Sequence, residues 1–214
     1  MIDGEHISSH SYDEIALSLI RECCGGLVLD CGAGSRQVDF SNVINFEIAD
    51  YPSTDILGVA EQLPFADETF DGVLSLAVLE HVSDPFRCAA EISRVLKKGG
   101  KLYCVVPFLQ PVHAYPNHFY NMTAQGLANL FNKSMYIRES FVPLSGVPMW
   151  MLSAVLNSWA MALEGSTREQ FLDMRVAELI NDPITYLNQD FVTKLPGSTN
   201  FELACTTAII AEKF

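Results

Sequence analysis

LVLDCGAG (27–34) is the stretch that decides the fold class of this chain. It begins as an apolar run, ends that run on an acid, Asp30, and turns at Gly32 and Gly34. Such runs form strands of parallel sheets that are buried on both faces, and glycines at the strand end let a ligand approach the backbone. A dinucleotide fingerprint would need a third glycine at position 37, where Gln37 stands. The stretch therefore predicts an α/β sheet with a nucleotide-like ligand at its carboxyl edge and without a pyrophosphate cradle.

Short apolar runs and amphipathic segments alternate on either side of this stretch, from residue 11 to residue 142. Strands are predicted at residues 27–31, 43–48, 55–59, 70–76, 101–107, 135–141 and 201–211. Helices are predicted at residues 11–24, 84–98, 123–131, 149–163 and 166–180. Ser11 with Glu14 is expected to cap the first helix, and Asp84 with Pro85 the second. Repeated strand and helix units of this kind indicate an α/β fold around a mostly parallel sheet.

The composition is that of one globular domain with an acidic surface. Of the 214 residues, 49% are hydrophobic and 18% are charged, which is typical of a single domain with a large core. Lys and Arg total 13 against 26 Asp and Glu, so the formal net charge is −13. Nucleic acids and anionic membranes are bound mainly through Lys and Arg. We therefore expect no nucleic-acid partner.

The cysteines, the first residues and the longest uncharged stretch favour a cytoplasmic protein. None of the six cysteines forms a Cys-x-x-Cys pair, so we expect reduced thiols. The opening MIDGEHISSH (1–10) lacks the apolar run of a secretory signal. The uncharged residues 140–163 include two prolines, one glycine and four serines, so no stable membrane span is expected. No cluster of acids or histidines has ligand spacing, so no metal is expected either.

A second acid ends the next predicted strand, VINFEI (43–48). Glu47 is placed there to accept hydrogen bonds from both hydroxyls of a ribose, as an ionised carboxylate does without offering a competing donor. Taken alone, it would more often be an exposed acid at a strand end. The LDCGAG stretch upstream makes the ribose interpretation the stronger one.

Four separated blocks resemble one known family in order and spacing. They are LVLDCGAG, FEIADYP, GVAEQLPFADETFDGVLSLAVLEHVSDPF and EISRVLKKGGKLYCVVPF. They resemble the class I S-adenosylmethionine (SAM) dependent methyltransferases, specifically the methyltransferase type 11 group, over residues 25–131. The segment 107–131 is more loosely similar to small bacterial members that are often associated with sugar and glycan pathways.

The resemblance implies a fold and a domain organisation. The fold would be Rossmann-like, with a seven-stranded mostly parallel sheet, helices on both faces, and one antiparallel strand, here 201–211. We expect a single domain over residues 1–214, with the cofactor-binding core at 25–131. Residues 143–200 would be a helical insertion before the last strand, serving as a lid over the substrate or as a homodimer contact.

The resemblance also implies SAM as cofactor, and it assigns residues to each part of that molecule. The methionine part of SAM would face Asp30, Gly32, Ala33 and Gly34, and the ribose would face Glu47. The adenine would lie against Ile48, Ala60 and Glu61. The sulfonium end would lie against Leu76 and Ala77. Two positions depart from the family pattern. Arg36 replaces the third small residue of the glycine loop, and Val59 stands where an aspartate commonly accepts a hydrogen bond from the adenine amino group.

Three histidines are the candidates for a catalytic base. His113 and His118 follow the fifth predicted strand, where substrates of this fold approach, and His81 follows the fourth. Each has a structural alternative, since His81 in particular could simply cap and pack the next helix. A base is needed because an acceptor hydroxyl must lose its proton.

The expected function is methyl transfer from SAM to an oxygen or nitrogen of a small-molecule acceptor, such as a sugar or glycan precursor. One alternative is a SAM-binding partner or sensor protein without catalysis, which the Val59 departure keeps open. A Rossmann dehydrogenase that uses NAD is the weaker alternative, because it does not explain the LPF and LEHV blocks.

Overall fold

The computed structural model describes residues 11–113 and 117–210. They form two compact units. The sheet unit comprises residues up to 108 together with 113–141, and the helical unit comprises residues 109–112 and 142 onward. Each unit is described by itself below, and every predicted site residue belongs to the sheet unit.

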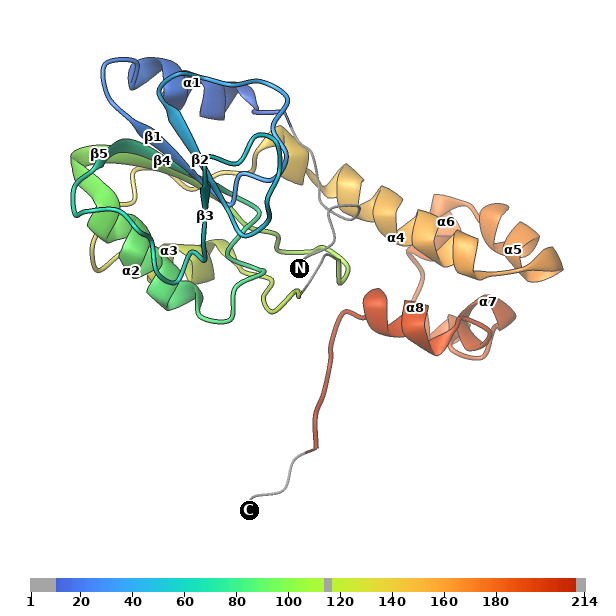
Figure 1. Cartoon of the computed structure of the whole chain (residues 1–214). Helices are drawn as coiled ribbons and strands as arrows, with labels where there is room; N and C mark the ends of the chain where they lie inside the picture. Colours follow the sequence, from blue (N-terminus) through green and yellow to red (C-terminus); the bar gives the residue numbers. More distant parts are fainter. Residues whose placement is uncertain (1–10, 114–116, 211–214) are drawn as a thin grey trace. The chain divides into compact units, whose positions relative to one another are not determined.

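Five strands build the sheet, all parallel, in the order β3-β2-β1-β4-β5 (Figure 1). They are β1 Val28–Cys31, β2 Val43–Glu47, β3 Ile56–Leu57, β4 Phe70–Leu76 and β5 Leu96–Val105. Asp30 lies opposite Asn45 of β2 and Leu74 of β4. The carboxyl ends of β1, β2 and β4 therefore meet at one edge, and the strand order reverses there on either side of β1, where ligands of open α/β sheets bind.

The expectation of seven strands with one antiparallel was wrong for the residues that the structure describes. Residues 135–141 have no regular structure, and the start of the expected last strand lies in a helix, α8 Gly197–Glu202. Residues 203–210 pair with no strand, and Ile209 and Ile210 are fully exposed. An apolar run becomes a strand only where it pairs with another strand, and this segment belongs to the helical unit, which has no strand among its described residues. Residues 143–200 are therefore not followed by a strand among the described residues, contrary to the expectation of an insertion before a last strand.

Helices cover both faces of the sheet (Figure 1). On one face, α1 Glu14–Glu22 packs Ala16, Leu19 and Ile20 against strand residues such as Val28. On the other, α2 Pro85–Val95 and α3 Ala124–Phe131 pack against strand residues such as Leu29. Neighbouring residues of β1 thus serve opposite cores, as the alternation of a strand requires.

The helix caps are local features, and the predictions for them were partly confirmed. The Asp84 side chain accepts a hydrogen bond from Arg87 N at 3.0 Å at the start of α2, as predicted. At the start of α1, however, the cap is Asp13, which accepts from Ala16 N at 2.8 Å, instead of Ser11. Aspartate is as good a cap as serine, and only two residues separate them.

The helical unit has a small core of its own. Its helices are α4 Pro148–Ala162, α5 Gly165–Leu172, α6 Val176–Leu179, α7 Asp190–Thr193 and α8, with short 3₁₀ turns η2 Leu144–Gly146 and η3 Pro183–Tyr186. Trp159 stacks on Phe171 with ring centroids 5.5 Å apart and donates a hydrogen bond to Phe191 O at 2.7 Å. The helix predicted over 166–180 is interrupted between α5 and α6, where Met174 turns toward this core.

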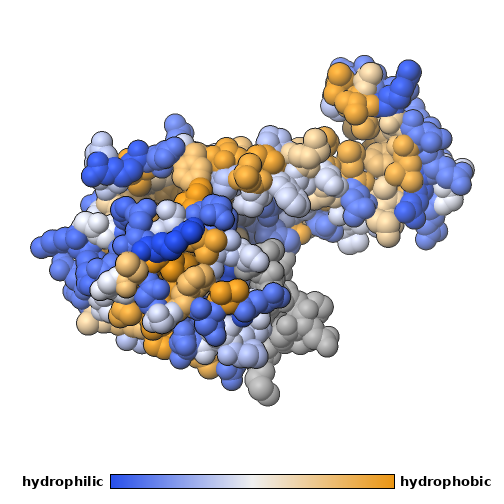
Figure 2. Space-filling view, turned by 90° about the horizontal axis from the view of Figure 1, so that it is seen from above, coloured by the Kyte–Doolittle hydropathy of each residue, from blue (hydrophilic) through white to orange (hydrophobic). Residues whose placement is uncertain are grey.

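Much of α4 exposes apolar side chains. Met149, Trp150, Leu152 and Met161 are all at least half exposed, and apolar surface is visible over both units (Figure 2). None of the helices in the described ranges has the length and apolar character needed to cross a membrane.

Candidate active site

The turn after β1 has a backbone that only glycine adopts easily. Gly32 and Gly34 have φ angles of +80° and +63°. A Cβ at Gly32 would also lie 2.5 Å from the Val78 side chain. The turn is tied to the next strand, because Gly32 N and Ala33 N both donate to Phe46 O, at 2.8 and 3.1 Å. The Gly-x-Gly turn is thereby fixed at the carboxyl edge of the sheet.

Glu47, at the end of β2, is held in place by this turn. Its Oε2 accepts a hydrogen bond from Gly34 N at 2.7 Å, and its Oε1 accepts from Ile48 N at 2.8 Å. Two amide donors stabilise the ionised carboxylate, and each oxygen retains a second lone pair for a ligand. Ile48 follows with its side chain exposed. The geometry thus places an oriented acceptor beside an apolar surface.

Asp30 is fully buried and already paired. Its Oδ2 accepts hydrogen bonds from Tyr12 Oη at 2.6 Å and from Arg36 Nε at 2.8 Å. The Arg36 guanidinium also lies 4.1 Å from the centre of the Tyr12 ring, which is a cation–π contact. Burial, and then the Asp30 charge, raise the pKa of Tyr12. Arg36, which departs from the family pattern, thus balances the charge of the buried acid.

The two oxygens of Asp30 differ in their hydrogen bonds. Its Oδ1 is buried and has no hydrogen-bond partner among the described residues. Sequence reasoning missed Tyr12, because a tyrosine ahead of the first helix carries no motif. Tyr12 precedes α1, and the packing of α1 against β1 brings the Tyr12 hydroxyl to Asp30.

The segment after β3 reaches the same edge, since Gly58 N donates to Glu47 O at 2.9 Å. Val59 is exposed and Ala60 is buried. The LPF turn that follows is fixed to α2, because Arg94 donates to the carbonyls of Leu63 and Phe65 at 3.0 and 2.7 Å. Ala60 and Glu61 thus lie between two fixed points of the backbone.

Tyr51 is a further polar group near Glu47 that the sequence analysis did not single out. Its hydroxyl is buried and without a hydrogen-bond partner among the described residues. Burial first, and then the Glu47 charge, raise its pKa. The only sequence signal was its place in the FEIADYP block.

The end of β4 makes a sharp turn. Ala77 is exposed and has a φ of +57°, and its N–H donates to Val105 O at 2.9 Å. A left-handed alanine costs on the order of 1–2 kcal/mol, and such strain often occurs at functional sites. Leu76 and Ala77, assigned to the sulfonium end, therefore stand where the chain turns into the LEHV segment.

The three candidate histidines come together at this edge, although His81 is more than thirty residues from His113 and His118 in the sequence. Ring centroids are 5.4 Å apart for His81 and His113, 5.6 Å for His81 and His118, and 4.4 Å for His113 and His118. Two hydrogen bonds hold the segment after His118 to the segment of His81, since Phe119 N and Tyr120 N both donate to Glu80 O, at 2.7 and 3.2 Å.

Hydrogen bonds distinguish the roles of these histidines. His118 Nδ1 accepts from His113 N at 3.2 Å, so His118 Nε2 carries the proton that bonds Asn121 Oδ1 at 3.0 Å. Both ring nitrogens of His118 are therefore engaged within the chain. His81 Nδ1 lies 2.8 Å from Asn117 O and must donate to it, because a carbonyl only accepts. This leaves Nε2 of neutral His81 with a lone pair.

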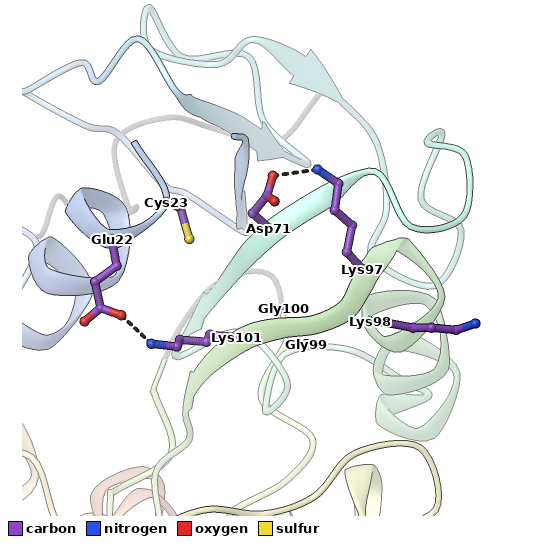
Figure 3. Close-up of a pocket in the computed structure, with 8 residues that line it drawn as sticks. All are labelled: Glu22, Cys23, Asp71, Lys97, Lys98, Gly99, Gly100 and Lys101. Carbon is purple, nitrogen blue, oxygen red and sulfur yellow. Dashed lines mark hydrogen bonds and ion pairs between the residues drawn. The ribbon is translucent and has the colours of Figure 1, made fainter. Parts of the chain in front are cut away.

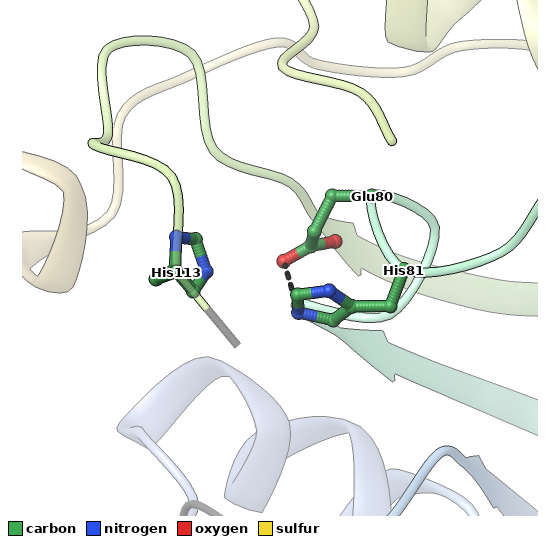
Figure 4. Close-up of side chains that lie close together, drawn as sticks. All are labelled: Glu80, His81 and His113. Atoms are coloured by element: carbon green, nitrogen blue, oxygen red, sulfur yellow. Dashed lines mark ion pairs between the residues drawn. The ribbon is translucent and has the colours of Figure 1, made fainter. Parts of the chain in front are cut away.

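Glu80, which the sequence analysis did not name, lies beside that lone pair (Figure 4). Its side chain is fully buried, and Oε1 lies 3.6 Å from His81 Nε2. Neither carboxyl oxygen has a hydrogen-bond partner among the described residues. Burial raises the pKa of Glu80 to about 8, and burial lowers the pKa of His81. The only local signal was an acid between Leu79 and His81 in the LEHV block.

A separate hollow of about 250 Å³ lies at the other edge of the sheet, where β4 and β5 begin (Figure 3). Its charges are paired: Lys97 with Asp71 at 2.8 Å, and Lys101 with Glu22. Burial raises the pKa of Cys23, which also lines it, so this thiol is not an activated nucleophile. The hollow contains none of the predicted site residues.

Comparison with known proteins identifies the family of this chain. The family described as "Methyltransferase domain" matches residues 29–104, which run from β1 into β5. An uncharacterized protein of Methanocaldococcus jannaschii is 30% identical over 156 residues, covering 62% of this chain and 68% of that protein. A demethylmenaquinone methyltransferase of Renibacterium salmoninarum is 39% identical over 134 residues, covering 61% of this chain and 56% of that enzyme, so the chain spans little more than half its length.

A similar solved structure is phosphoethanolamine N-methyltransferase 2 of Haemonchus contortus in complex with SAM. It is 15% identical, with a TM-score of 0.45, over 87% of this chain and 47% of that one. The family match, the archaeal relative and the glycine turn beside Glu47 lead to one conclusion. This chain belongs to the class I SAM-dependent methyltransferase family.

Proposed function

We propose that this protein binds SAM at the carboxyl ends of β1, β2 and β4 and transfers its methyl group to an oxygen or nitrogen of a small-molecule acceptor. The observation that carries the proposal is the Glu47 carboxylate, which the amides of Gly34 and Ile48 orient beside the left-handed glycine turn. Its free lone pairs suit the two hydroxyls of a ribose.

The other proposed cofactor contacts follow the same edge. Asp30 Oδ1, with Gly32 and Ala33, would receive the methionine part, and the exposed side chain of Ile48 would cover one face of the adenine. The remaining contacts are Ala60 and Glu61 at the adenine edge and Leu76 and Ala77 at the sulfonium end. Arg36 keeps Asp30 charge-balanced before and after binding.

The chemistry asks little of the protein beyond positioning. SAM, when bound, supplies a methyl group that its positively charged sulfur already makes electrophilic. The residues of the turn after β4 would align the acceptor and exclude water. His81 and His113 are the proposed bases, because each lies in the histidine cluster and His81 is neutral with a lone pair on Nε2. His118 would position His113 through its backbone, since both of its own ring nitrogens are engaged.

For the acceptor we propose a hydroxylated small molecule of the sugar or glycan-precursor class, in line with the sequence resemblance over 107–131. Methyl transfer to carbon is a second candidate, because a similar protein of Idiomarina loihiensis is named a ubiquinone/menaquinone biosynthesis C-methyltransferase. The exposed apolar residues of α4 support a role of the helical unit in covering the acceptor or in forming a dimer contact.

Calorimetric titration with S-adenosylhomocysteine and with NAD tests the cofactor assignment. We expect S-adenosylhomocysteine to bind and NAD not to bind. Binding of NAD, or of neither compound, would overturn the proposal. Release of S-adenosylhomocysteine from SAM in the presence of a sugar and metabolite pool then separates an enzyme from a SAM-binding sensor, which would release none.

A further inference from the structure

We propose that Glu80, His81 and His113 form a binding site for a divalent transition-metal ion of the zinc class at the acceptor end of this edge. Metal binding by these side chains does not depend on the proposed function. It revises the expectation of no metal, which rested on spacing along the sequence alone.

The first support is the convergence of three ligand atoms. One atom each from Glu80, His81 and His113 lies within 4.8 Å of the other two (Figure 4). Zinc binds nitrogen and oxygen ligands at about 2.0–2.2 Å, so tetrahedral ligand atoms stand roughly 3.4 Å apart. The His81 Nε2 to Glu80 Oε1 separation of 3.6 Å already fits. Side-chain rotation has to bring the remaining atoms closer by about an ångström.

The second support is the orientation of His81. Its Nδ1–H donates to Asn117 O, so the Nε2 lone pair is the one that faces Glu80. Metal-bound histidines are usually oriented in this way, by a carbonyl or carboxylate that takes the proton of the other ring nitrogen. His118 acts on His113 in a different way, because its Nδ1 accepts the backbone N–H of His113 at 3.2 Å and so positions the backbone of His113.

The third support is the Glu80 carboxyl group. It is fully buried, and among the described residues neither oxygen has a hydrogen-bond partner. Buried polar groups in folded proteins are nearly always paired, and a buried unpaired carboxylate is costly. Glu80 Oε1 and the lone pair of His81 Nε2 face each other, so a cation between them satisfies both.

The fourth support is that the two segments are held together in advance. Glu80 O accepts from Phe119 N and Tyr120 N, and the Tyr120 hydroxyl donates to Ser83 O at 3.1 Å. Residues 119–120 are thereby tied to the turn that carries Glu80 and His81, and the bond from His113 N to His118 Nδ1 links His113 to the same segment. These bonds bring the two segments together before an ion binds.

The donor set selects the ion. Two imidazoles and one carboxylate suit Zn²⁺ or Co²⁺, whereas Ca²⁺ and Mg²⁺ prefer oxygen ligands throughout. Three protein ligands also leave a fourth position open, as catalytic zinc sites do. If the proposed function holds, that position suits an acceptor hydroxyl, whose pKa the ion would lower. With the ion bound, the lone pair of His81 Nε2 is used in coordination, so the ion takes the place of the histidine bases, and His81 and His113 act as bases only in the metal-free protein.

Co²⁺ titration of the metal-free full chain, followed by visible absorption, tests the site. We expect one equivalent to bind with ligand-field bands of nitrogen and oxygen ligation and without a thiolate charge-transfer band. Zn²⁺ should displace the Co²⁺. Glu80→Gln, His81→Ala and His113→Ala should each weaken binding at least about tenfold, as even the loss of supporting residues does in metal sites. Glu139→Gln removes an exposed carboxylate and should change nothing.

Three outcomes would overturn the site: no binding, a thiolate band that moves the ion to the cysteines, or unchanged affinity in the three variants. Circular dichroism identifies any variant that fails to fold. His113 lies in a partly exposed loop, so His113→Ala is expected to fold and to test the site even if the Glu80 variant does not fold. S-adenosylhomocysteine binding, measured on the same samples, separates the two proposals. Its loss would count against the cofactor site, and its retention without Co²⁺ binding would count against the metal site alone.

Discussion

Replacing Glu80 by glutamine isolates the cost of burying this carboxyl group. Burial raises its pKa from the usual 4.5 to about 8. Between these two values the unfolded chain ionises Glu80 while the folded protein keeps its proton, so the free energy of unfolding falls as the pH rises. At about 1.4 kcal/mol per pH unit, this loss between pH 4.5 and pH 7 amounts to roughly 3 kcal/mol, as an order of magnitude.

Glu80→Gln preserves the shape of the side chain and cannot ionise, so this part of the pH dependence should disappear. In urea denaturation with a chelator present, we expect the variant to gain up to roughly 3 kcal/mol on the wild type as the pH rises from 4.5 to 7. The Glu139→Gln control should follow the wild type. Parallel pH profiles for wild type and Glu80→Gln would refute a neutral, buried Glu80. With Zn²⁺ in place of the chelator, the wild type should instead be stabilised more than the variant.

Four further outcomes are expected. Glu47→Ala should lower S-adenosylhomocysteine affinity in calorimetry by one to two orders of magnitude, because it removes a charge-assisted acceptor of roughly 1.5–3 kcal/mol; unchanged affinity would remove the ribose assignment. Since Val59 offers no acceptor to the adenine amino group, SAM analogues without that group should lose little affinity, and a large loss would reveal another acceptor. Deleting residues 147–190 should reduce methyl transfer or solubility more than SAM binding, and normal turnover of the shortened protein would exclude a lid. His113→Ala or His81→Ala should lower turnover by roughly two to four orders of magnitude with SAM affinity retained. Wild-type turnover in both variants would show that neither histidine is a catalytic base.

Some elements were predictable because their signals are local. The run LVLDC became β1, the Asp84 cap began α2, and the glycine turn adopted the left-handed backbone that its residues permit. The last predicted strand fails for the opposite reason. FELACTTAIIA (201–211) has strand-forming residues, but a strand also needs a partner edge, which no local pattern supplies.

The candidate site divides in the same way. Glu47 at the end of its strand could be read from the sequence, because the ends of parallel strands share one edge whatever the rest of the chain does. The pairing of Tyr12 and Arg36 with Asp30, and the meeting of Glu80 and His81 with His113, depend on contacts between segments far apart in the chain. The sequence by itself determined the five parallel strands of the sheet, its glycine turn and its family. Only the tertiary structure decided which charges are buried and which of them face one another, because burial and long-range approach follow from packing and not from neighbouring residues.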